Sequence, residues 1–439
     1  MTVEAQTGLK ADIDVEDRAP ASSLETATPE TVGFSSDRLE KLNAAMQAQV
    51  DGGKYAGITI LVARHGKVLN FRAIGRRDLE QDAPLRKDTI FRIASMTKPI
   101  TAVALMSLYD EGRWSFDDPV SKFIPQFAGL KVMTASGLVE PDHSMTMREL
   151  LTSTGGIPSV LPPDMVHMAG ALVRNLEVTR LYAEADLNAG TVADMVEKIS
   201  RLPLAYQPGS DFEYGLSHDV QGHVVERISG QGLDEFFRER IFEPLRMSDT
   251  GFGVAAGERD RLATVYGYDD EGALTRARLD NDRSQGIQPA YLSGSGGLYS
   301  TAGDYLRLAS MLAGGGALDG ARILSPGAVG LMTRDLLPKG VQQHFAIRLE
   351  GLGYGVGVGI VLDPGRASFN SGAFGVGAYY WTGMFGSWWW NDPVNDLTVI
   401  GLTQQDAAAT AHVGLPHPAP DLRALSTALV YAALVEPKR

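Results

Sequence analysis

The chain has 439 residues, of which 44% are hydrophobic and 21% charged, a composition typical of a soluble globular protein with room for two or three lobes of about 150 residues. Its formal net charge of −13 disfavours nucleic acid and anionic membranes as partners, which leaves small molecules. The absence of cysteine excludes disulfides and thiolate metal sites, and no apolar run approaches the ~18 residues of a membrane span.

The N-terminal region predicts a tail, a helix and a hairpin. Residues 1–25 are acidic and lack the basic and apolar stretches of a signal peptide, so we expect residues 1–30 to be a disordered tail and the protein to be cytoplasmic. A serine at position 35 or 36 caps a helix over residues 37–50. Residues 57–63 and 68–72 are typical of strands and flank His65-Gly66, which predicts an antiparallel hairpin.

The next segment places a serine and a lysine at the start of a buried helix. Residues 88–99 read Asp-Thr-Ile-Phe-Arg-Ile-Ala-Ser-Met-Thr-Lys-Pro, and the apolar residues 100–109 lead to Gly112, which suits the C′ position. Proline lacks an N–H and fits only where that donor is unused, so Pro99 confines the helix start to about Ser95 or slightly later. Ser95 then lies in the field of unpaired N–H groups, with Lys98 one turn below it on the same face.

This pair of residue types suits nucleophilic catalysis. A serine hydroxyl becomes nucleophilic when a base takes its proton, and a desolvated lysine can have a pKa low enough to share in that step. The alternative is that Ser95 caps the helix and Lys98 is a solvated side chain. Of the eleven lysines only Lys98 follows a serine by three residues, and the helix is too apolar for the surface. Against this, the residue before a proline disfavours the α region.

Residues 110–290 predict an inserted, mainly helical lobe with long loops. A short helix is expected over residues 147–153. A turn at Pro208-Gly209 delivers Tyr214 just before a helix that continues to Ile228. A phenol beside a lysine ammonium can have a lowered pKa, act as a general base and return its proton to the leaving group. The alternative is that Tyr214 is an ordinary core residue.

Strands are expected again near the C-terminus. Residues 352–362, 379–390 and 397–403 are typical of strands, and residues 421–435 of a helix. The glycine-rich run 352–362 lacks the G-x-G-x-x-G spacing of a nucleotide site, so close backbone packing explains it better. The predicted fold class is α+β. An antiparallel sheet flanked by N- and C-terminal helices is built from residues 31–110 and 291–439, with residues 111–290 as the helical domain.

Together these motifs resemble the serine β-lactamase and penicillin-binding-protein superfamily, in particular class C β-lactamases and family VIII carboxylesterases. The resemblance covers about residues 30–435, and its most specific part is Asp-Thr-x-Phe-Arg-Ile-Ala-Ser-x-Thr-Lys-Pro. It implies a serine β-lactamase-like fold in which Ser95 is acylated and Lys98 and Tyr214 activate it.

A third family motif faces the serine from a strand, as Lys-Thr-Gly in β-lactamases and as Trp-x-Gly or His-x-Gly in many esterases. The match here is Trp381-Thr382-Gly383, and the residues after it resemble the glycine-rich strand of the esterases, which ends in Asp-Pro. The resemblance implies that Trp381 and Gly383 contact the substrate. It also implies that the backbone N–H groups of Ser95 and Met384 form an oxyanion hole, in which one donor can be worth ~3 kcal/mol of barrier. Residues 293–302 match a further family stretch, interpreted as scaffold under the pocket.

Departures from the family pattern bear on the substrate. No Lys-Thr-Gly occurs, and the β-lactamase Tyr-x-Asn is Tyr214-Gly215-Leu216, so the carboxylate-binding lysine and the amide-binding asparagine are both missing. This disfavours β-lactams. The family's usual histidine after Leu-Leu-Thr is Ser153, which the sequence leaves without an interpretation. No G-x-S-x-G surrounds any serine, which argues against an α/β-hydrolase. His218 and Asp219 are adjacent on one helix and point to different faces, so a Ser-His-Asp triad has no support.

The sequence therefore predicts a serine carboxylesterase that acts on small or short-acyl esters through an acyl-enzyme on Ser95, with no cofactor or metal. A β-lactamase, a DD-peptidase or an amide hydrolase on the same scaffold is the alternative, and a catalytically silent binding homologue is a third reading. A small-molecule ester is the expected partner, without nucleic acid or membrane. The physiological ester, its preferred acyl or alcohol part, residual β-lactamase activity, the oligomeric state and the principal base stay open.

Overall fold

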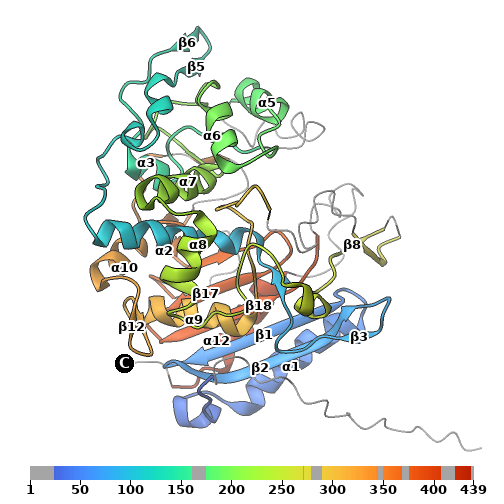
Figure 1. The fold of residues 1–439 in the computed structure, drawn as a ribbon. Helices are drawn as coiled ribbons and strands as arrows, with labels where there is room; N and C mark the ends of the chain where they lie inside the picture. Colours follow the sequence, from blue (N-terminus) through green and yellow to red (C-terminus); the bar gives the residue numbers. More distant parts are fainter. Residues whose placement is uncertain are drawn as a thin grey trace, which may run out of the picture.

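The computed structural model describes residues 24–160, 175–269, 271–277, 289–341, 350–367, 375–406 and 421–436, together with the backbone of residues 343–344. A large antiparallel sheet forms the centre of the molecule, with helices on both of its faces and a mainly helical region beyond one end (Figure 1). The predicted α+β class is confirmed.

The central sheet joins the two ends of the chain. Its order is β14-β15-β16-β17-β18-β1-β2-β3, and all neighbours are antiparallel. The middle of the sheet is the pair β1 and β18, whose register runs from Thr59 opposite Leu402 to Arg64 opposite Leu397. Every residue of β1 is buried. The strands are β1 (Gly57–Arg64), β2 (Lys67–Asp78), β3 (Ala83–Pro84), β14 (Leu352–Tyr354), β15 (Gly359–Val361), β16 (Tyr379–Thr382), β17 (Trp388–Asp392) and β18 (Leu397–Leu402).

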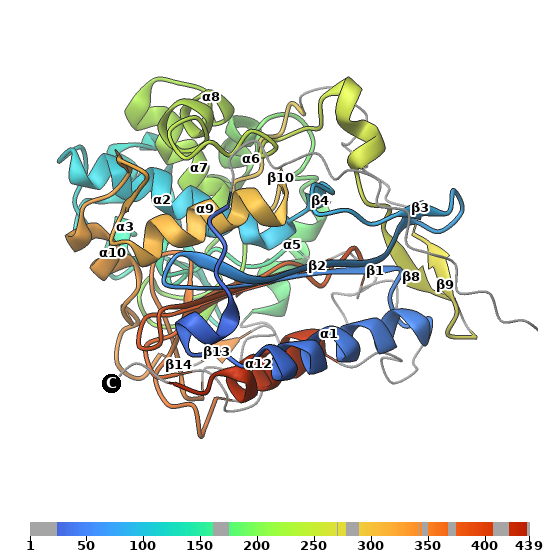
Figure 2. The ribbon, with the colours of Figure 1, turned by 90° about the horizontal axis from the view of Figure 1, so that it is seen from below.

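Two helical layers bury the two faces of this sheet. One face is covered by α1 (Ser36–Asp51) and α12 (Leu422–Ala433), which lie side by side (Figure 2). The predicted helix at residues 37–50 is confirmed, and Ser35 caps it by accepting from the Arg38 N–H. The other face is covered by α2 (Thr97–Asp110), α9 (Ala302–Ala313) and α10 (Pro326–Met332), around the largest apolar core of the described residues.

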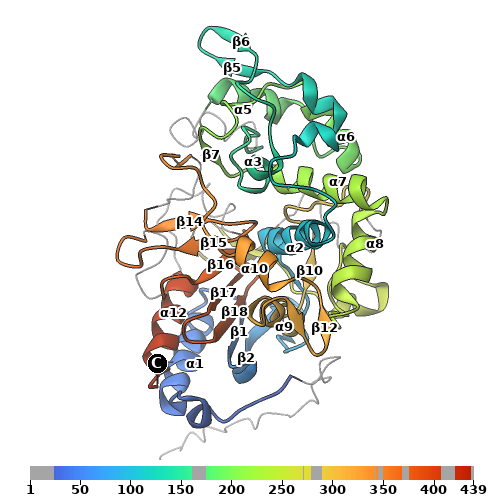
Figure 3. The ribbon, with the colours of Figure 1, turned by 90° about the vertical axis from the view of Figure 1, so that its left-hand side faces the viewer.

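The region between residues 111 and 290 is mainly helical where it is described. Figures 1 and 3 show α3, α5, α6 and the β5–β6 hairpin gathered beyond α2 and α7, away from the sheet. The helices here are α3 (Met147–Leu151), α5 (Leu176–Glu184), α6 (Val192–Ile199), α7 (Ser217–Ser229) and α8 (Leu233–Phe237). Short two-stranded pairs complete the fold, and their strands are β4 (Phe91–Arg92), β5 (Val132–Thr134), β6 (Gly137–Val139), β7 (Phe212–Glu213), β8 (Tyr266–Tyr268), β9 (Leu274–Arg276), β10 (Tyr299–Ser300), β11 (Ala317–Leu318), β12 (Ala321–Arg322) and β13 (Gln343–His344). The division into separate domains stays a prediction.

Two predicted strands prove to be hairpins. Residues 352–362 form β14 and β15, joined by a turn in which the Gly355 N–H donates to the Val358 carbonyl and Gly357 has φ of 72°. Residues 379–390 form β16 and β17, with Gly386 at φ of 81° in the connection. Positive φ is accessible to glycine and costly for other residues, so these glycines reverse the chain where the apolar pattern predicted a continuous strand.

Within the part of the chain that the structure describes, no helix is long and apolar enough to cross a membrane.

Candidate active site

Ser95 lies at the start of α2, as the sequence predicts. A single 3₁₀ turn, Ala94–Met96, precedes the helix, and the helix itself is buried from Thr97 to Leu108. Ala94 has φ of 45°, in the left-handed region that a residue with a Cβ rarely adopts. Such a conformation costs about 1–3 kcal/mol and persists only where the surroundings impose it. The backbone that presents Ser95 is therefore held in place by its neighbours.

The strand before Ser95 is fixed from both sides. On one side the Ile90 N–H donates to the Arg261 carbonyl, and the Ala263 N–H donates back to the Ile90 carbonyl, both at 2.9 Å. On the other side β4 pairs with β10, and the Ile93 N–H donates to the Leu298 carbonyl at 3.1 Å. Backbone bonds on both edges leave this segment little freedom.

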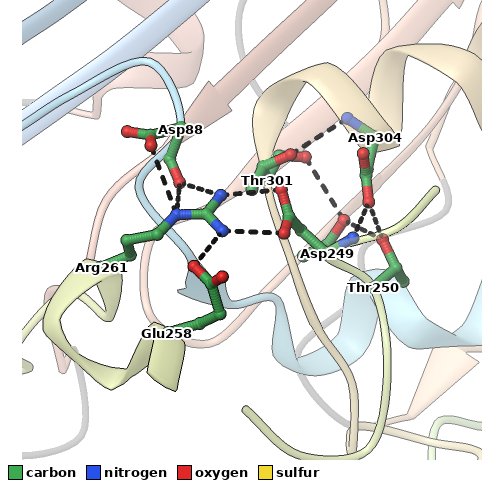
Figure 4. A network of polar contacts seen from close by, with 8 residues as sticks. Asp88, Asp249, Thr250, Glu258, Arg261, Thr301 and Asp304 are labelled. Atoms are coloured by element: carbon green, nitrogen blue, oxygen red, sulfur yellow. Dashed lines mark hydrogen bonds and ion pairs between the residues drawn. The ribbon is translucent and has the colours of Figure 1, made fainter. Parts of the chain in front are cut away.

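A charged network around Arg261 secures the same segment (Figure 4). The Arg261 guanidinium donates to both carboxylate oxygens of Asp249, at 2.9 and 2.7 Å, and to Glu258 at 2.8 Å. It also donates to the Asp88 carbonyl at 2.7 Å. These carboxylates raise the pKa of Arg261 further above its already high value. Bidentate pairs of this kind fix geometry as well as charge, so the network holds the start of the Ser95 segment.

Two functional groups converge on the Ser95 hydroxyl. The Tyr214 Oη lies 2.8 Å from the Ser95 Oγ, and the Lys98 Nζ lies 3.2 Å from it. Lys98 also donates to the Ser295 carbonyl at 2.7 Å, and its Nζ lies 4.6 Å from the centre of the Tyr214 ring. The structure thus brings together the three residues that the motifs predicted, from positions 119 residues apart in the chain. Their catalytic roles stay a prediction.

Tyr214 is held between β7 and α7 by its backbone. The Glu213 N–H donates to the Ser153 carbonyl at 3.1 Å, and the Ser159 hydroxyl donates to the Tyr214 carbonyl. Gly215 permits a close approach, because a Cβ there would lie 2.5 Å from the Pro158 carbonyl. Ser153, which the sequence left uninterpreted, is buried at φ of 58° and helps to place Tyr214 through its backbone.

Asp219 fixes the loop that receives Lys98. Its Oδ1 accepts from the Ser293 hydroxyl at 2.7 Å and from the Ser295 N–H at 3.1 Å, so the Ser295 carbonyl faces Lys98. From the sequence alone, the only role open to Asp219 was membership of a Ser-His-Asp triad with His218. His218 is fully buried, and neither ring nitrogen has a hydrogen-bond partner within the described chain. Burial, and next the nearby Lys98 charge, hold the pKa of His218 well below its ordinary value.

Gly383 brings the β16–β17 turn against the Ser95 segment. A Cβ at this position would lie 2.6 Å from the Ile93 carbonyl oxygen and 2.3 Å from the Ser387 Oγ, so only glycine fits. Met384 follows in the turn and is 54% exposed. The turn's hydrogen bonds use the N–H groups of Gly383 and Gly386 and leave that of Met384 unused among the described residues. An oxyanion hole from Ser95 and Met384 stays a prediction.

Trp381 is enclosed by tyrosines. Only 6% of it is exposed, and its ring centre lies 5.6 Å from that of Tyr214, 5.5 Å from that of Tyr354 and 6.5 Å from that of Tyr380. Its indole N–H has no partner among the described residues. Trp381 therefore has little exposed surface for its predicted contact with the substrate, which stays a prediction. In the described ranges no three His, Asp or Glu side chains are grouped so as to hold a metal ion.

Comparisons with known proteins agree with these motifs. A family model described as Beta-lactamase matches residues 42–417. Protein Rv1367c of Mycobacterium tuberculosis is 34% identical over 388 residues, 84% of this chain and 92% of that protein. Esterase EstB of Burkholderia gladioli is 30% identical over 415 residues, 90% of this chain and 97% of EstB. The solved structure of EstCE1, described as a hydrolase with promiscuous acyltransferase activity, has a TM-score of 0.71 at 27% identity and covers 90% of this chain and 99% of its own.

Proposed function

Because this chain belongs to the beta-lactamase family, we propose that it is a serine hydrolase that cleaves small or short-acyl carboxylic esters through an acyl-enzyme on Ser95. The observation that carries the proposal is the convergence of the Tyr214 Oη and the Lys98 Nζ on the Ser95 Oγ, at 2.8 and 3.2 Å. A nucleophile with its base at hydrogen-bond distance is the arrangement that covalent catalysis needs.

The contacts of Lys98 favour Tyr214 as the principal base. Lys98 donates to a carbonyl and to the serine hydroxyl, and it faces the π cloud of Tyr214, all of which suit a charged ammonium. The Ser295 carbonyl and the Ser95 hydroxyl hold the Lys98 ammonium in place, so Tyr214 is the group at hydrogen-bond distance that is left to take the Ser95 proton.

The reaction follows from these positions. Tyr214 takes the proton of Ser95 while the Ser95 Oγ forms a bond to the ester carbonyl carbon, and the N–H groups of Ser95 and Met384 stabilise the resulting oxyanion. Tyr214 gives that proton to the alcohol oxygen as its bond to the carbonyl carbon breaks. A water molecule then loses a proton to Tyr214, attacks the acyl group and releases the carboxylic acid, and the proton returns to Ser95.

Two positions favour esters over β-lactams. Leu216 and Trp381 stand where β-lactamases carry an asparagine and a lysine, so neither position supplies the amide donor or the cation that would bind a lactam's amide and carboxylate. The relatives EstB and EstCE1, named as an esterase and a hydrolase, support the same reading. A β-lactamase, DD-peptidase or amide hydrolase on this scaffold is the alternative, and a silent binding protein is a third.

Two rate measurements separate these functions. We expect hydrolysis of p-nitrophenyl butyrate and slow or no hydrolysis of nitrocefin. Ser95→Ala should abolish ester turnover with an unchanged circular dichroism spectrum, and a fluorophosphonate probe should label Ser95. Nitrocefin turnover as efficient as that of the ester would favour a β-lactamase. A protein that neither turns over esters nor is labelled would be a silent homologue.

A further inference from the structure

Four aromatic rings, one of them that of Tyr214, form a cluster that is here called the aromatic clamp. Its members are Phe212, Tyr214, Tyr354 and Trp381. Trp381 contacts Tyr214 and Tyr354, with ring centres 5.6 and 5.5 Å apart, and Tyr354 contacts Phe212 at 5.2 Å. Phe212 precedes Tyr214 by two residues in the same segment. The two rings from the central sheet therefore contact both aromatic residues of the segment that carries the tyrosine.

The clamp connects two parts of the fold that meet at Ser95. Phe212 and Tyr214 come from β7 and the residue after it, while Tyr354 and Trp381 come from β14 and β16 of the central sheet. The backbone reinforces this connection, because β13 pairs in parallel with β7, Gln343 opposite Phe212 and His344 opposite Glu213. The position of Tyr214 relative to the sheet is thus set by both ring contacts and backbone bonds.

Three of the four rings are closed to substrate. Phe212 is fully buried, Tyr354 is 1% exposed and Trp381 is 6% exposed, whereas Tyr214 is only partly buried. The Lys98 Nζ also lies over the Tyr214 ring, 4.6 Å from its centre. The phenol therefore contacts both the Lys98 amine and the Trp381 indole, with its hydroxyl directed at Ser95.

We infer that Trp381 and Tyr354 are positioning residues, which hold the Tyr214 ring so that its hydroxyl stays within reach of Ser95. The inference rests on the proposed function of Tyr214 as the base. Proton transfer requires close approach, and a displacement of ~1 Å can cost ~10²-fold in rate. On this inference Trp381 contributes to catalysis mainly by positioning Tyr214, and not by contacting the acyl chain of the substrate.

Tyr354 itself is unsuited to act as the base. Burial, and next the Tyr214 charge, raise the pKa of Tyr354 well above its ordinary value, so it stays protonated. The two phenols therefore divide their tasks according to their surroundings. Tyr214 exchanges the proton, and the Tyr354 ring supports Trp381 and Phe212.

The test compares variants on a series of p-nitrophenyl esters from acetate to octanoate. We expect Trp381→Leu and Tyr354→Leu each to lower kcat about 10- to 100-fold, with KM nearly unchanged. The factor should be the same for every acyl length. Tyr354→Phe keeps the ring and should retain near-native kcat. Trp390→Leu is the matched control, because it removes an equally buried indole whose ring stacks on Tyr431, and it should leave kcat unchanged.

A further readout separates positioning from general loss of structure. In Trp381→Leu the rate at which a fluorophosphonate labels Ser95 should fall in parallel with kcat. The fluorophosphonate reacts with Ser95 directly and requires no ester substrate. If the wild-type protein were labelled but hydrolysed no ester, the ester function would be refuted, and the inference about the clamp would be tested by the labelling rates of the variants.

Several results would overturn the inference. A loss in Trp381→Leu that appears in KM and grows with acyl length would show that Trp381 contacts substrate. A loss in Tyr354→Phe as large as in Tyr354→Leu would show that the hydroxyl, and not the ring, is needed. If Trp381→Leu does not fold by circular dichroism, Tyr354→Leu and Trp381→Phe provide the same comparison, with Trp381→Phe expected to retain most of kcat.

Discussion

Replacement of Asp304 by asparagine should make the stability of the protein less dependent on pH. Asp304 lies in the first turn of α9 within the network of Figure 4, and its Oδ2 accepts from the Asp249 N–H at 2.8 Å and from the Thr250 hydroxyl at 2.9 Å. Burial raises the pKa of this carboxyl from 3.8 to about 7, despite these two hydrogen bonds. An asparagine oxygen can accept the same two bonds without carrying a charge.

The sign and size follow from the two pKa values. The folded protein holds the proton more tightly than the unfolded chain, so the contribution of Asp304 to stability is complete below pH 3.8 and is lost as the pH rises to about 7. A shift of about three units corresponds to about 4 kcal/mol. For a chain of 439 residues this is a change of about 4 °C in Tm.

Thermal unfolding at pH 4 to 8 tests this reasoning. The difference in Tm between Asp304→Asn and the wild type should shift in favour of the variant by up to about 4 °C between pH 4 and pH 8. Asp260→Asn, which alters an exposed carboxylate in the turn that also carries Arg261, is the control and should follow the wild type. Parallel curves for the wild type and Asp304→Asn would refute the assignment of a buried, protonated Asp304.

Four other single variants have expected outcomes. Tyr214→Phe and Lys98→Ala should each lower kcat on p-nitrophenyl butyrate by at least ~10²-fold, and the double variant should lose less than the product of the two; near-native activity in either would refute the shared proton transfer. Gly383→Ala should lower both kcat and Tm, because its Cβ would lie 2.6 Å from the Ile93 carbonyl oxygen and would force the turn away from it; steady-state rates and thermal unfolding measure this, and native values of both would contradict it. The pKa of His218 is depressed by burial, so stability should fall as the pH falls below about 6.5, and His218→Leu should show a flatter profile in urea unfolding between pH 7 and 5.

Local sequence patterns were sufficient for the parts of the site that lie on regular elements. Apolar residues around Pro99 predicted a buried helix, and the spacing of Ser95 and Lys98 placed both on one face of its first turn. The residues around Tyr214 predicted a turn before a helix, and α7 begins at Ser217. Such patterns depend on neighbours in sequence, and tertiary packing did not overturn them here.

Contacts between segments far apart in the sequence could not be predicted from such local patterns. Asp219 meets Ser293 and Ser295 across 74 and 76 residues, and nothing near Asp219 in the sequence indicates that loop. Trp381 looked like a surface for substrate because its motif was known and its neighbours in space were not. The hairpin at residues 379–392 was missed because apolar residues continue through the turn, and the reversal depends on the conformation of a few glycines.

The pairing of β1 with β18 has a consequence for how the protein is made. Thr59 in β1 can pair with Leu402 in β18 only after Leu402 has been synthesised, 343 residues later. At ~5–20 residues per second this takes roughly 17–70 s, during which the apolar β1–β2 hairpin has one edge without a partner. Exposed strand edges of this kind attract other chains. The strand at the centre of the finished sheet is an open edge during most of translation, and the yield of native protein should therefore depend on chaperones that cover it.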